Sequence, residues 1–577
     1  MKVVMAKKAG FCMGVRRAVQ LAIRASYEAE KPVYTYGPLI HNEQALKLLE
    51  MLGVKTLKEI PKKAHGTIII RAHGVPPEDK RRLKEAGFKV LDGTCPRVAY
   101  VQALARKYSR QGYQVIIIGD PDHAEVKGIL GYAGGKGLVV SSFKDLERLP
   151  PLKNYVVLSQ TTQDEELFEL LAQEILARYP GGKVYRTICR ATHDRQREVR
   201  RLAKECDAIV VVGGKHSANT KRLALIAREE GKEVFLVETA DELDLEKLKK
   251  YRKVGVTAGA STPNWVINQV VRTLEELPSP YEAAIWRVGR KVLRFLFESN
   301  LALALGAASL SGAVLWAAGF PWQWPLVLMI SLFLFAAHTV NRLVDLKSLR
   351  LNDPFRARFL EKNRKIFSLL TAATYLLALG ISLSYGVPVF LLLLFLVLTS
   401  IVYSLPVFGR NDHFSPVQRI PGARSLFIAL GWWAAMILLP AFVFSYQPVL
   451  NWLGGLVFII AFMRAVFLEL LELQGDGFVG KETLPVFLGK EKTFWVLKGM
   501  WFILGLLVLG GLVSRAFPPP YAALFLVVAY VYFVLHQYEK ELLGRNFYLE
   551  VLAEGLPVIT ALSLLVAEGG SRLVSQR

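Results

Sequence analysis

The chain has 577 residues, of which 52% are hydrophobic and 21% charged, so it is too apolar for one ordinary soluble protein and is neither disordered nor collagen-like. Four cysteines are too few for a disulfide scaffold, and we expect a reducing compartment in which thiols serve as metal ligands or catalysts. The net charge of +23 points to nucleic acid or to an anionic surface, and the position of the charges must decide between them.

From Met1 to about Pro278, short β-rich runs alternate with polar helical patterns. The opening residues MKVVMAKKAGFC contain no apolar stretch of signal-peptide length, so we expect this half in the cytoplasm. The alternation predicts parallel sheets covered by helices, in a three-subdomain α/β fold with approximate threefold symmetry. The expected strands include 2–6, 67–71, 89–92, 114–119, 155–159, 183–188, 208–213, 233–237 and 253–257, and the expected helices include 16–28, 97–111, 164–178, 194–205 and 220–229.

Three cysteines directly follow expected strands and precede helices: Cys12, Cys95 and Cys189. Ligands bind outside the carboxyl ends of parallel strands, so we expect one cysteine from each subdomain to converge on a central point. Three thiolates can hold a [4Fe–4S] cluster and leave its fourth iron open to substrate. A zinc site is the competing interpretation, although four ligands in close pairs would be more usual for zinc. We expect Cys206, on a helix face before a strand, to pack in the core.

Other polar residues follow strand ends in the same way. The histidines are His41, His73 and His123. They supply hydrogen-bond donors that can be cationic, which suits a polyanionic ligand. The small polar residues are Ser217, Asn219 and Ser261. They stand at helix starts, where free N–H groups and the helix dipole favour phosphate; simple N-capping is the alternative.

Glu125 lies two residues after His123, and Thr161 follows another strand end in the motif SQTT. A carboxylic acid in a closed pocket is suited to donate a proton. An open iron, an anion-binding cradle and a proton source together fit reductive removal of a hydroxyl group from a small phosphorylated substrate.

The N-terminal half resembles the 4-hydroxy-3-methylbut-2-enyl diphosphate reductase family from Met1 to about Leu277. The motifs that carry the resemblance are GFCMGVRRA, HNE, RAHGV, DGTCP, HAEV, SQTT, ICRATHDRQ, GGKHSANTKRL and GVTAGAS. The resemblance implies that the three cysteines ligate the cluster and that the three histidines with Ser217, Asn219 and Ser261 bind the diphosphate. It also implies that Glu125 and Thr161 relay protons and that Thr192 lies near the cluster and the substrate.

The implied reaction converts (E)-4-hydroxy-3-methylbut-2-enyl diphosphate, a hydroxymethylbutenyl diphosphate, into isopentenyl and dimethylallyl diphosphates. This is the last step of the methylerythritol phosphate route, with electrons from a donor of the ferredoxin or flavodoxin type. Ala218 stands where the family more often has a second serine, and we expect this to weaken one phosphate contact at most. An iron–sulfur hydro-lyase, which needs an open iron but no net electrons, is the alternative for this half.

From about Ser299 onward, nine apolar stretches reach membrane-spanning length. They cover 300–319, 325–340, 366–385, 387–406, 425–445, 451–470, 494–513, 520–536 and 550–567. Basic residues gather after the second, fourth, sixth and eighth stretches, which predicts a multi-pass cell-membrane protein with its N-terminal half in the cytoplasm. Membrane orientation thus largely explains the net charge, and we expect no nucleic-acid partner. The expected domains are a reductase domain (1–278), a basic interfacial linker (279–298) and a membrane domain (299–577).

Two expected span ends carry polar residues along one helical face. Asn341 and Asp345 stand at i and i+4, and Glu469, Glu472 and Asp476 stand at i, i+3 and i+7. Two opposed acidic faces would hold Mg²⁺ against a diphosphate, whereas solvated helix ends without chemistry are the alternative.

These motifs, with GDGFVGKETLPVFLG and the nine spans, resemble the UbiA-type intramembrane prenyltransferases over about 295–570. The resemblance implies Mg²⁺-dependent transfer of a prenyl group from a polyprenyl diphosphate to a lipid-soluble acceptor within the bilayer, with Lys481, Arg419 and Arg424 as diphosphate contacts. Leu349 stands where a second aspartate is usual, and Asp353 is a candidate substitute for it; Glu469 and Glu472 also replace usual aspartates. A non-catalytic membrane anchor is the alternative for this half.

Overall fold

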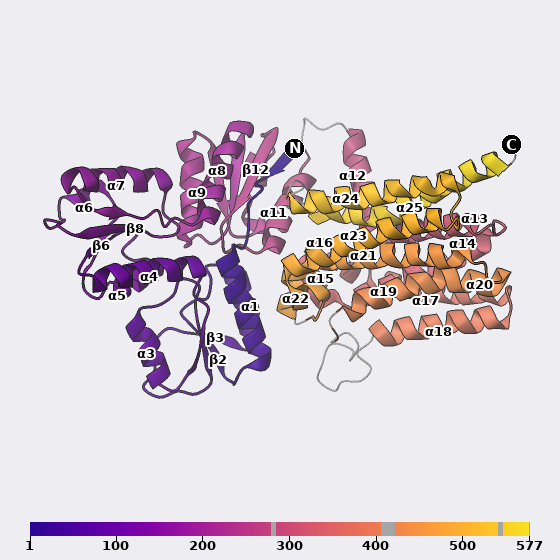
Figure 1. The fold of residues 1–577 in the computed structure, drawn as a ribbon, viewed down its shortest axis with the longest axis horizontal. Helices are drawn as coiled ribbons and strands as arrows, with labels where there is room; N and C mark the ends of the chain where they lie inside the picture. Colours follow the sequence, from indigo (N-terminus) through magenta and orange to yellow (C-terminus); the bar gives the residue numbers. More distant parts are fainter. Residues whose placement is uncertain (279–283, 405–419, 421, 480, 541–545, 576–577) are drawn as a thin grey trace. The chain divides into compact units, whose positions relative to one another are not determined.

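The computed structural model describes residues 1–278, 284–404, 420, 422–479, 481–540 and 546–575. The chain divides into two compact units, Met1–Glu282 and Ala283–Arg577. The first unit contains three separate four-stranded sheets with helices between them, and the second is helical (Figure 1). Of the expected linker, residues 279–283 lie outside the described part, and the rest forms helix α12 (Ala284–Glu298).

All strand pairs in the first unit are parallel, as the alternating pattern predicts. The first sheet has the order β1-β12-β10-β11, with β1 (Lys2–Met5), β10 (Ala208–Val212), β11 (Glu233–Val237) and β12 (Lys253–Ala258). The second sheet has the order β5-β4-β2-β3, with β2 (Val33–Tyr36), β3 (Val54–Leu57), β4 (Thr67–Ile70) and β5 (Lys89–Asp92). The third sheet has the order β9-β8-β6-β7, with β6 (Gln114–Ile118), β7 (Gly137–Val140), β8 (Tyr155–Ser159) and β9 (Lys183–Val184).

Written in this direction, the three sheets are equivalent strand by strand, which confirms the expected three-part α/β architecture. We call each sheet with its helices a lobe; β1, β5 and β9 are equivalent edge strands. The helices of this unit are α1 (Met13–Glu28), α2 (Glu43–Met51), α3 (Pro77–Glu85), α4 (Pro96–Arg110), α5 (Ala124–Tyr132), α6 (Phe143–Leu146), α7 (Glu165–Arg178), α8 (Arg190–Glu205), α9 (Ala218–Glu229), α10 (Leu245–Leu248) and α11 (Asn264–Glu276).

The third sheet is covered on both faces, so its central strands β6 and β8 are largely apolar. In the third lobe, Val115 and Ile117 of β6 pack in one hydrophobic cluster with α4 and α5, and Ile116 and Ile118 pack in another with α7. Burial on both sides explains why runs such as QVIII read as strands without polar alternation.

The strand predictions differ from the structure in two respects. Strands β3 and β7, each a run of four residues, were not among those expected, and β2 was indicated only by the run that precedes His41. Strand β9 ends at Val184, although 183–188 was expected. Beyond it, the side chain of Thr187 hydrogen-bonds to the backbone of Ser159 at 2.7 Å and so replaces ordinary strand pairing.

Every expected apolar stretch of the second unit falls on a helix. These helices are α13 (Leu301–Ala317), α14 (Trp324–Val344), α17 (Arg364–Leu383), α18 (Val387–Ser404), α19 (Ala423–Trp433) continued by α20 (Leu439–Phe444), α21 (Val449–Val479), α23 (Lys490–Val513), α24 (Phe525–Glu539) and α25 (Asn546–Ser575). Short helices α15 (Leu346–Asn352), α16 (Pro354–Lys362) and α22 (Leu484–Leu488) complete the unit.

Among the described residues, seven helices are long and apolar enough to cross a membrane. The count is eight if α12 and α13, which are bent by 77°, form one broken span. Many large apolar side chains on these helices are exposed, such as Leu369 and Leu376 at 72% and 70%, as lipid-facing positions require. The second unit is a multi-pass membrane domain.

Candidate active sites

The three equivalent edge strands of the first unit each lead to a cysteine. Cys12 follows β1 and caps α1, Cys95 follows β5 and caps α4, and Cys189 follows β9 and caps α8. Each lobe therefore contributes one thiol at the N-terminus of a helix, as the sequence predicts. Backbone N–H groups at such positions favour the thiolate, and the N–H of Val15 donates to the Cys12 sulfur at 3.5 Å.

The three thiols line a single cavity of about 100 Å³. At about 10–15 Å³ for each water-sized probe, this space holds several water molecules. Burial raises the pKa of the Cys95 thiol, as does its proximity to Cys12 and Cys189, whereas the backbone N–H groups of Arg97 and Val98 act in the opposite direction. The chemistry of three thiols that line one cavity, with backbone N–H donors beside them, fits an iron–sulfur cluster.

Gly14 allows α1 to approach the second lobe closely. A Cβ atom at this position would lie 2.6 Å from the sulfur of Cys95. The glycine therefore keeps the space beside that sulfur free. The fourth cysteine, Cys206, is 2% exposed and packs in the hydrophobic core of the first lobe with Leu202 and Ile209.

The next two strands of each lobe bring the other expected residues to the same cavity. His41, His123 and Ser217 each stand five residues after the equivalent strands β2, β6 and β10. The equivalent strands β4, β8 and β12 are followed within three residues by His73, Thr161 and Ser261. All twelve site residues expected in this unit line the cavity: Cys12, His41, His73, Cys95, His123, Glu125, Thr161, Cys189, Thr192, Ser217, Asn219 and Ser261.

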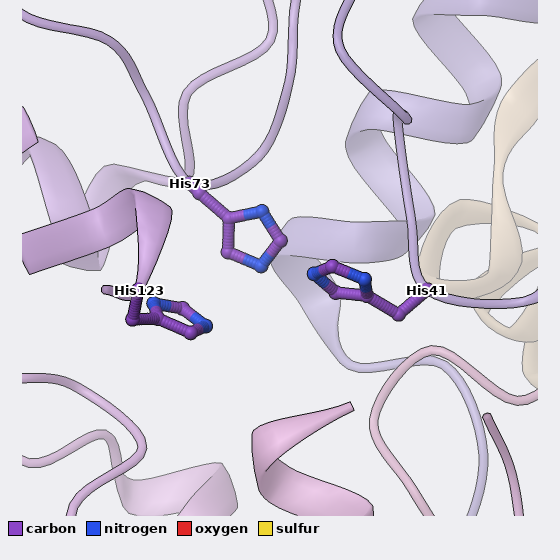
Figure 2. Close-up of side chains that lie close together, drawn as sticks. All are labelled: His41, His73 and His123. Carbon is purple, nitrogen blue, oxygen red and sulfur yellow. The ribbon is translucent and has the colours of Figure 1, made fainter. Parts of the chain in front are cut away.

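The three histidines form a compact cluster in which His73 lies between His41 and His123 (Figure 2). Neighbouring ring centroids are 5.2 Å apart, and one nitrogen from each ring lies within 4.8 Å of the others. One small ion or one phosphate group could therefore contact all three rings.

The electrostatic environment keeps these imidazoles neutral near pH 7. Burial, and to a smaller extent the charge of His41, lower the pKa of His123 to about 4. Burial also lowers the pKa of His73 and of His41. The Nδ1 atom of His123 accepts a hydrogen bond from the Glu125 backbone N–H at 3.2 Å, so its proton is assigned to Nε2. These lowered pKa values favour neutral histidines over the cations that the residue type alone allows.

The small polar residues differ in how far their hydrogen bonds are satisfied. Ser217 caps α9, accepting from the Thr220 N–H at 3.4 Å, and the Ser261 hydroxyl donates to the carbonyl of His41 at 3.2 Å. The side-chain nitrogen of Asn219 is buried without a hydrogen-bond partner among the described residues. An unsatisfied buried donor at a cavity wall is typical of a site that awaits an acceptor.

Glu125 is 1% exposed and holds both carboxylate oxygens against Thr161. The backbone N–H of Thr161 donates to Oε1 at 2.7 Å and its hydroxyl donates to Oε2 at 2.9 Å. Burial raises the pKa of Glu125 to about 7, although both hydrogen bonds lower it. A carboxyl group with this pKa holds and releases a proton at neutral pH.

Two further residues of the cavity wall with polar or charged side chains were not expected from the sequence. Arg97 lies in the first turn of α4, and Thr162 is equivalent by position to His73 and Ser261. The second could have been found by aligning the strand ends of the three lobes, since it also stands three residues after its strand.

The second unit has a cavity of about 70 Å³ between helix ends. Of the expected metal-binding residues, Asn341, Asp345, Glu469 and Glu472 line it. Asp476 is fully buried beside it and accepts hydrogen bonds from Ser348 at 2.6 Å and Asn352 at 3.1 Å.

Two of the three expected diphosphate contacts, Lys481 and Arg424, also line this cavity, while Arg419 lies outside the described residues. Lys481 forms an ion pair with Asp345 and lies 3.6 Å from Asp476. Arg424 lies 3.6 Å from Asp345. The two acidic motifs therefore face each other across shared cations.

The candidate substitute for the missing aspartate does not reach the cavity. Asp353 caps α16, accepting from the Arg356 N–H at 3.1 Å, whereas Leu349 itself is part of the cavity wall. Both carboxylate oxygens of Glu469 are buried without a hydrogen-bond partner among the described residues. Unsatisfied carboxylate oxygens in a group of acidic and amide side chains fit Mg²⁺, which prefers oxygen ligands.

In comparisons with known proteins, the two units of the chain are similar to different proteins. Residues 3–275 match the family model described as LytB protein. The 4-hydroxy-3-methylbut-2-enyl diphosphate reductase of Geobacter sulfurreducens is 43% identical over 276 residues, which cover 48% of this chain and 98% of that protein.

Two solved structures are similar to parts of the chain. A structure of (E)-4-hydroxy-3-methyl-but-2-enyl diphosphate reductase is 41% identical, with a TM-score of 0.39, and covers 48% of this chain and 100% of that one. A UbiA homolog from Archaeoglobus fulgidus, solved with GPP and Mg²⁺, is 17% identical, with a TM-score of 0.35, and covers 47% of this chain and 98% of that one.

Proposed function

The N-terminal half of the chain belongs to the LytB family of 4-hydroxy-3-methylbut-2-enyl diphosphate reductases, and we propose that it reduces (E)-4-hydroxy-3-methylbut-2-enyl diphosphate at a [4Fe–4S] cluster. Two electrons and two protons are consumed, the hydroxyl group leaves as water, and isopentenyl and dimethylallyl diphosphates are formed. The observation that carries this proposal is the convergence of one thiol from each lobe on a cavity that also contains a buried carboxyl group and a histidine cluster.

In this proposal Cys12, Cys95 and Cys189 hold the cluster, and no fourth cysteine of the chain lines the cavity. When bound, the cluster supplies a Lewis-acidic iron for the substrate hydroxyl and a route for electrons. The diphosphate is bound by the neutral histidines and the small polar residues at helix starts: His41, His73, His123, Ser217, Asn219 and Ser261. Asn219 supplies the donor that has no partner in the described structure.

Glu125 is the proton source in this scheme, and Thr161 holds its carboxylate in place. The carboxyl group is buried at the cavity wall, so its proton is available to the substrate rather than exchanged freely with solvent. Thr192 is 5% exposed and completes the wall in the first turn of α8, close to Cys189.

The decisive experiment is anaerobic purification of the full chain in detergent, followed by iron and sulfide analysis and by an assay on the hydroxylated five-carbon diphosphate. Product formation that depends on an added reductant, such as reduced ferredoxin or flavodoxin, supports the reductase. Product formed without any reductant would instead identify a hydro-lyase. An iron-free, colourless protein would contradict both the reductase and the hydro-lyase proposals.

For the membrane domain we propose a Mg²⁺-dependent transfer of a prenyl group from a polyprenyl diphosphate to a lipid-soluble acceptor. The supporting observation is the cavity at which two acidic motifs face each other, with Glu469 unsatisfied and Lys481 between Asp345 and Asp476. Prenyl transfer in membranes that is lost on Asp476→Ala supports this proposal. No transfer, or transfer unchanged by that substitution, would leave this unit as an anchor.

We further propose that the reductase domain, 1–278, lies in the cytoplasm and that residues 279–298 connect it to the membrane surface. The support is the basic residues after alternate spans and the amphipathic character of α12. Accessibility of the N-terminal half to protease in inside-out vesicles, with protection in intact cells, tests this orientation.

A further inference from the structure

Arg71 is a partly buried cation behind the histidine cluster that the proposed reaction does not yet use. It directly follows β4, two residues before His73. Its guanidinium lies against Gly37, where φ is +69° and where an added Cβ would be 2.7 Å from Nη1. The glycine therefore provides both the turn and the space that the guanidinium occupies.

The charge of Arg71 has no partner close to it. Its Nε atom is buried and makes no hydrogen bond within the described residues, and no described carboxylate lies within 4.0 Å of its guanidinium. Tyr36 and Asp79 act on it at longer range, but Asp79 is 3.9 Å from Arg82 and accepts a hydrogen bond from the Tyr36 hydroxyl at 3.3 Å.

The charge of Arg71 also acts on the three histidines. Arg71 contributes to the lowered pKa of His41, His73 and His123, in each case after burial itself. The Arg71 side chain does not line the cavity, although Ala72 and His73 do, and it lies outside the cavity wall against the turn at Gly37 that leads from β2 to His41.

A partly buried cation without an anionic partner lowers the stability of the folded protein, and three neutral imidazoles do not offset its charge. An anion bound on the other side of the imidazoles would offset it. Among the described residues that line the cavity, Arg97 is the one lysine or arginine, and it is exposed to solvent that screens its charge.

We propose that Arg71 is a positioning residue that supplies the fixed positive charge behind the histidine cluster, so that the imidazoles bind a diphosphate group as neutral donors. This inference rests on the proposed function for the identity of the anion. Because the guanidinium cannot lose its proton at physiological pH, the attraction would not depend on protonation of a histidine.

The test is calorimetric binding of inorganic pyrophosphate to the full chain, purified anaerobically in detergent, at low and high salt. We expect Arg71→Gln to weaken binding about tenfold or more at low salt, since a charge pair partly shielded from water is worth more than one in bulk solvent. Arg71→Lys keeps the charge, so its affinity for pyrophosphate should stay within about threefold of that of the parent protein. The difference in affinity between these two proteins and Arg71→Gln should become smaller at high salt.

Arg82→Gln is the matched control. It removes a cation near the same Asp79, but from the exposed surface of α3, and should leave pyrophosphate binding unchanged. In steady-state assays Arg71→Gln should raise KM more than it lowers kcat. Should that variant lose its iron, Arg71→Met, which keeps an extended side chain without the charge, takes its place.

Equal binding of pyrophosphate by Arg71→Gln and Arg82→Gln would overturn the inference. Equal loss of affinity in Arg71→Lys and Arg71→Gln would also overturn it, because the shape of the side chain rather than its charge would then matter. Absence of pyrophosphate binding to the parent protein would overturn it as well. If the variants bind pyrophosphate with the expected order of affinities but the parent protein does not turn over the hydroxylated substrate, the anion site would be supported and the reductase proposal contradicted.

Discussion

Thr161 donates to both carboxylate oxygens of Glu125, once from its backbone N–H and once from its hydroxyl. These hydrogen bonds favour the ionised carboxylate, whereas burial favours the protonated form, and burial is the larger effect. The balance sets the proton affinity of the only carboxylate that lines the cavity in the described residues.

The first prediction concerns the pH dependence of reduction. A carboxylic acid with a pKa of about 7 carries its proton below that pH and loses it above, so kcat should fall as pH rises through about 7. Glu125→Gln should lower kcat by about 10²–10⁴-fold, the usual contribution of a general acid. Thr161→Val removes one hydrogen bond that lowers the pKa, and should move the decline to higher pH. A decline that stays in place in Thr161→Val would contradict this assignment.

The second prediction concerns the thiols. Cys12→Ser, Cys95→Ser and Cys189→Ser should each lower the iron content of anaerobically purified protein by more than about half, because each lobe supplies a single ligand. Cys206→Ser is the control: it should keep its iron and lose about 1–3 kcal/mol of stability from burying a hydroxyl. Equal iron loss in all four variants would point to general unfolding.

The third prediction concerns Gly14. Replacing a helical glycine by alanine usually stabilises a helix by about 1 kcal/mol. Here the added methyl group would meet the Cys95 sulfur at 2.6 Å. Gly14→Ala should therefore keep its helical circular dichroism but lose iron faster than the parent protein during dialysis against a chelator. Unchanged iron retention would show that α1 can move away from the second lobe.

The fourth prediction concerns divalent ions in the membrane domain. Glu469→Gln should weaken binding of Mn²⁺, a spectroscopic substitute for Mg²⁺, because it removes an anionic oxygen ligand that lines this cavity. Paramagnetic resonance of the detergent-solubilised chain measures the bound ion. Glu491→Gln, on the exposed first turn of α23, is the control and should bind as the parent does. If the two variants bind Mn²⁺ equally, the ion does not use Glu469.

The fifth prediction concerns α12. Ile285, Val288, Val292 and Phe295 recur at helical spacing and are 49–77% exposed, whereas basic residues occupy the opposite face. Such a helix lies in the membrane interface with its apolar face toward the acyl chains. Val292→Trp places a fluorescent side chain on this apolar face, and brominated lipids in vesicles should quench the fluorescence that it adds to the parent protein. Added fluorescence that brominated lipids leave unchanged would mean that this face stays in water.

Strand ends explain why most of the first site could be predicted from the sequence. Cys12, His41 and Ser261 are all recognisable locally, because each follows a β-rich run and precedes a helix, and parallel strands end on one side. The position of Arg71 in the sequence did not indicate a functional role. The role that we propose for Arg71 depends on its buried Nε and on the lack of a carboxylate close to it among the described residues, which only the tertiary structure defines.

The site in the membrane domain shows a different limit of prediction from the sequence. The helical spacing of Glu469 and Glu472 was sufficient to place both at one cavity, because both lie on the single helix α21. The role of Asp353 could not be read in this way. Its chain turns into α16 there, and capping that helix competes with metal binding for the same carboxylate.

Strand β1 pairs with β12, so Lys2 lies beside Lys253 although nearly the whole reductase domain separates them along the chain. A ribosome makes β1 long before its neighbour exists, and the sheet that orients the first thiol cannot close until the last strand has emerged. Under the proposed function, the cluster would be inserted only after this strand has been made, while the hydrophobic segments that follow it are being synthesised. Iron delivery and membrane targeting would thus converge on the same short interval of translation.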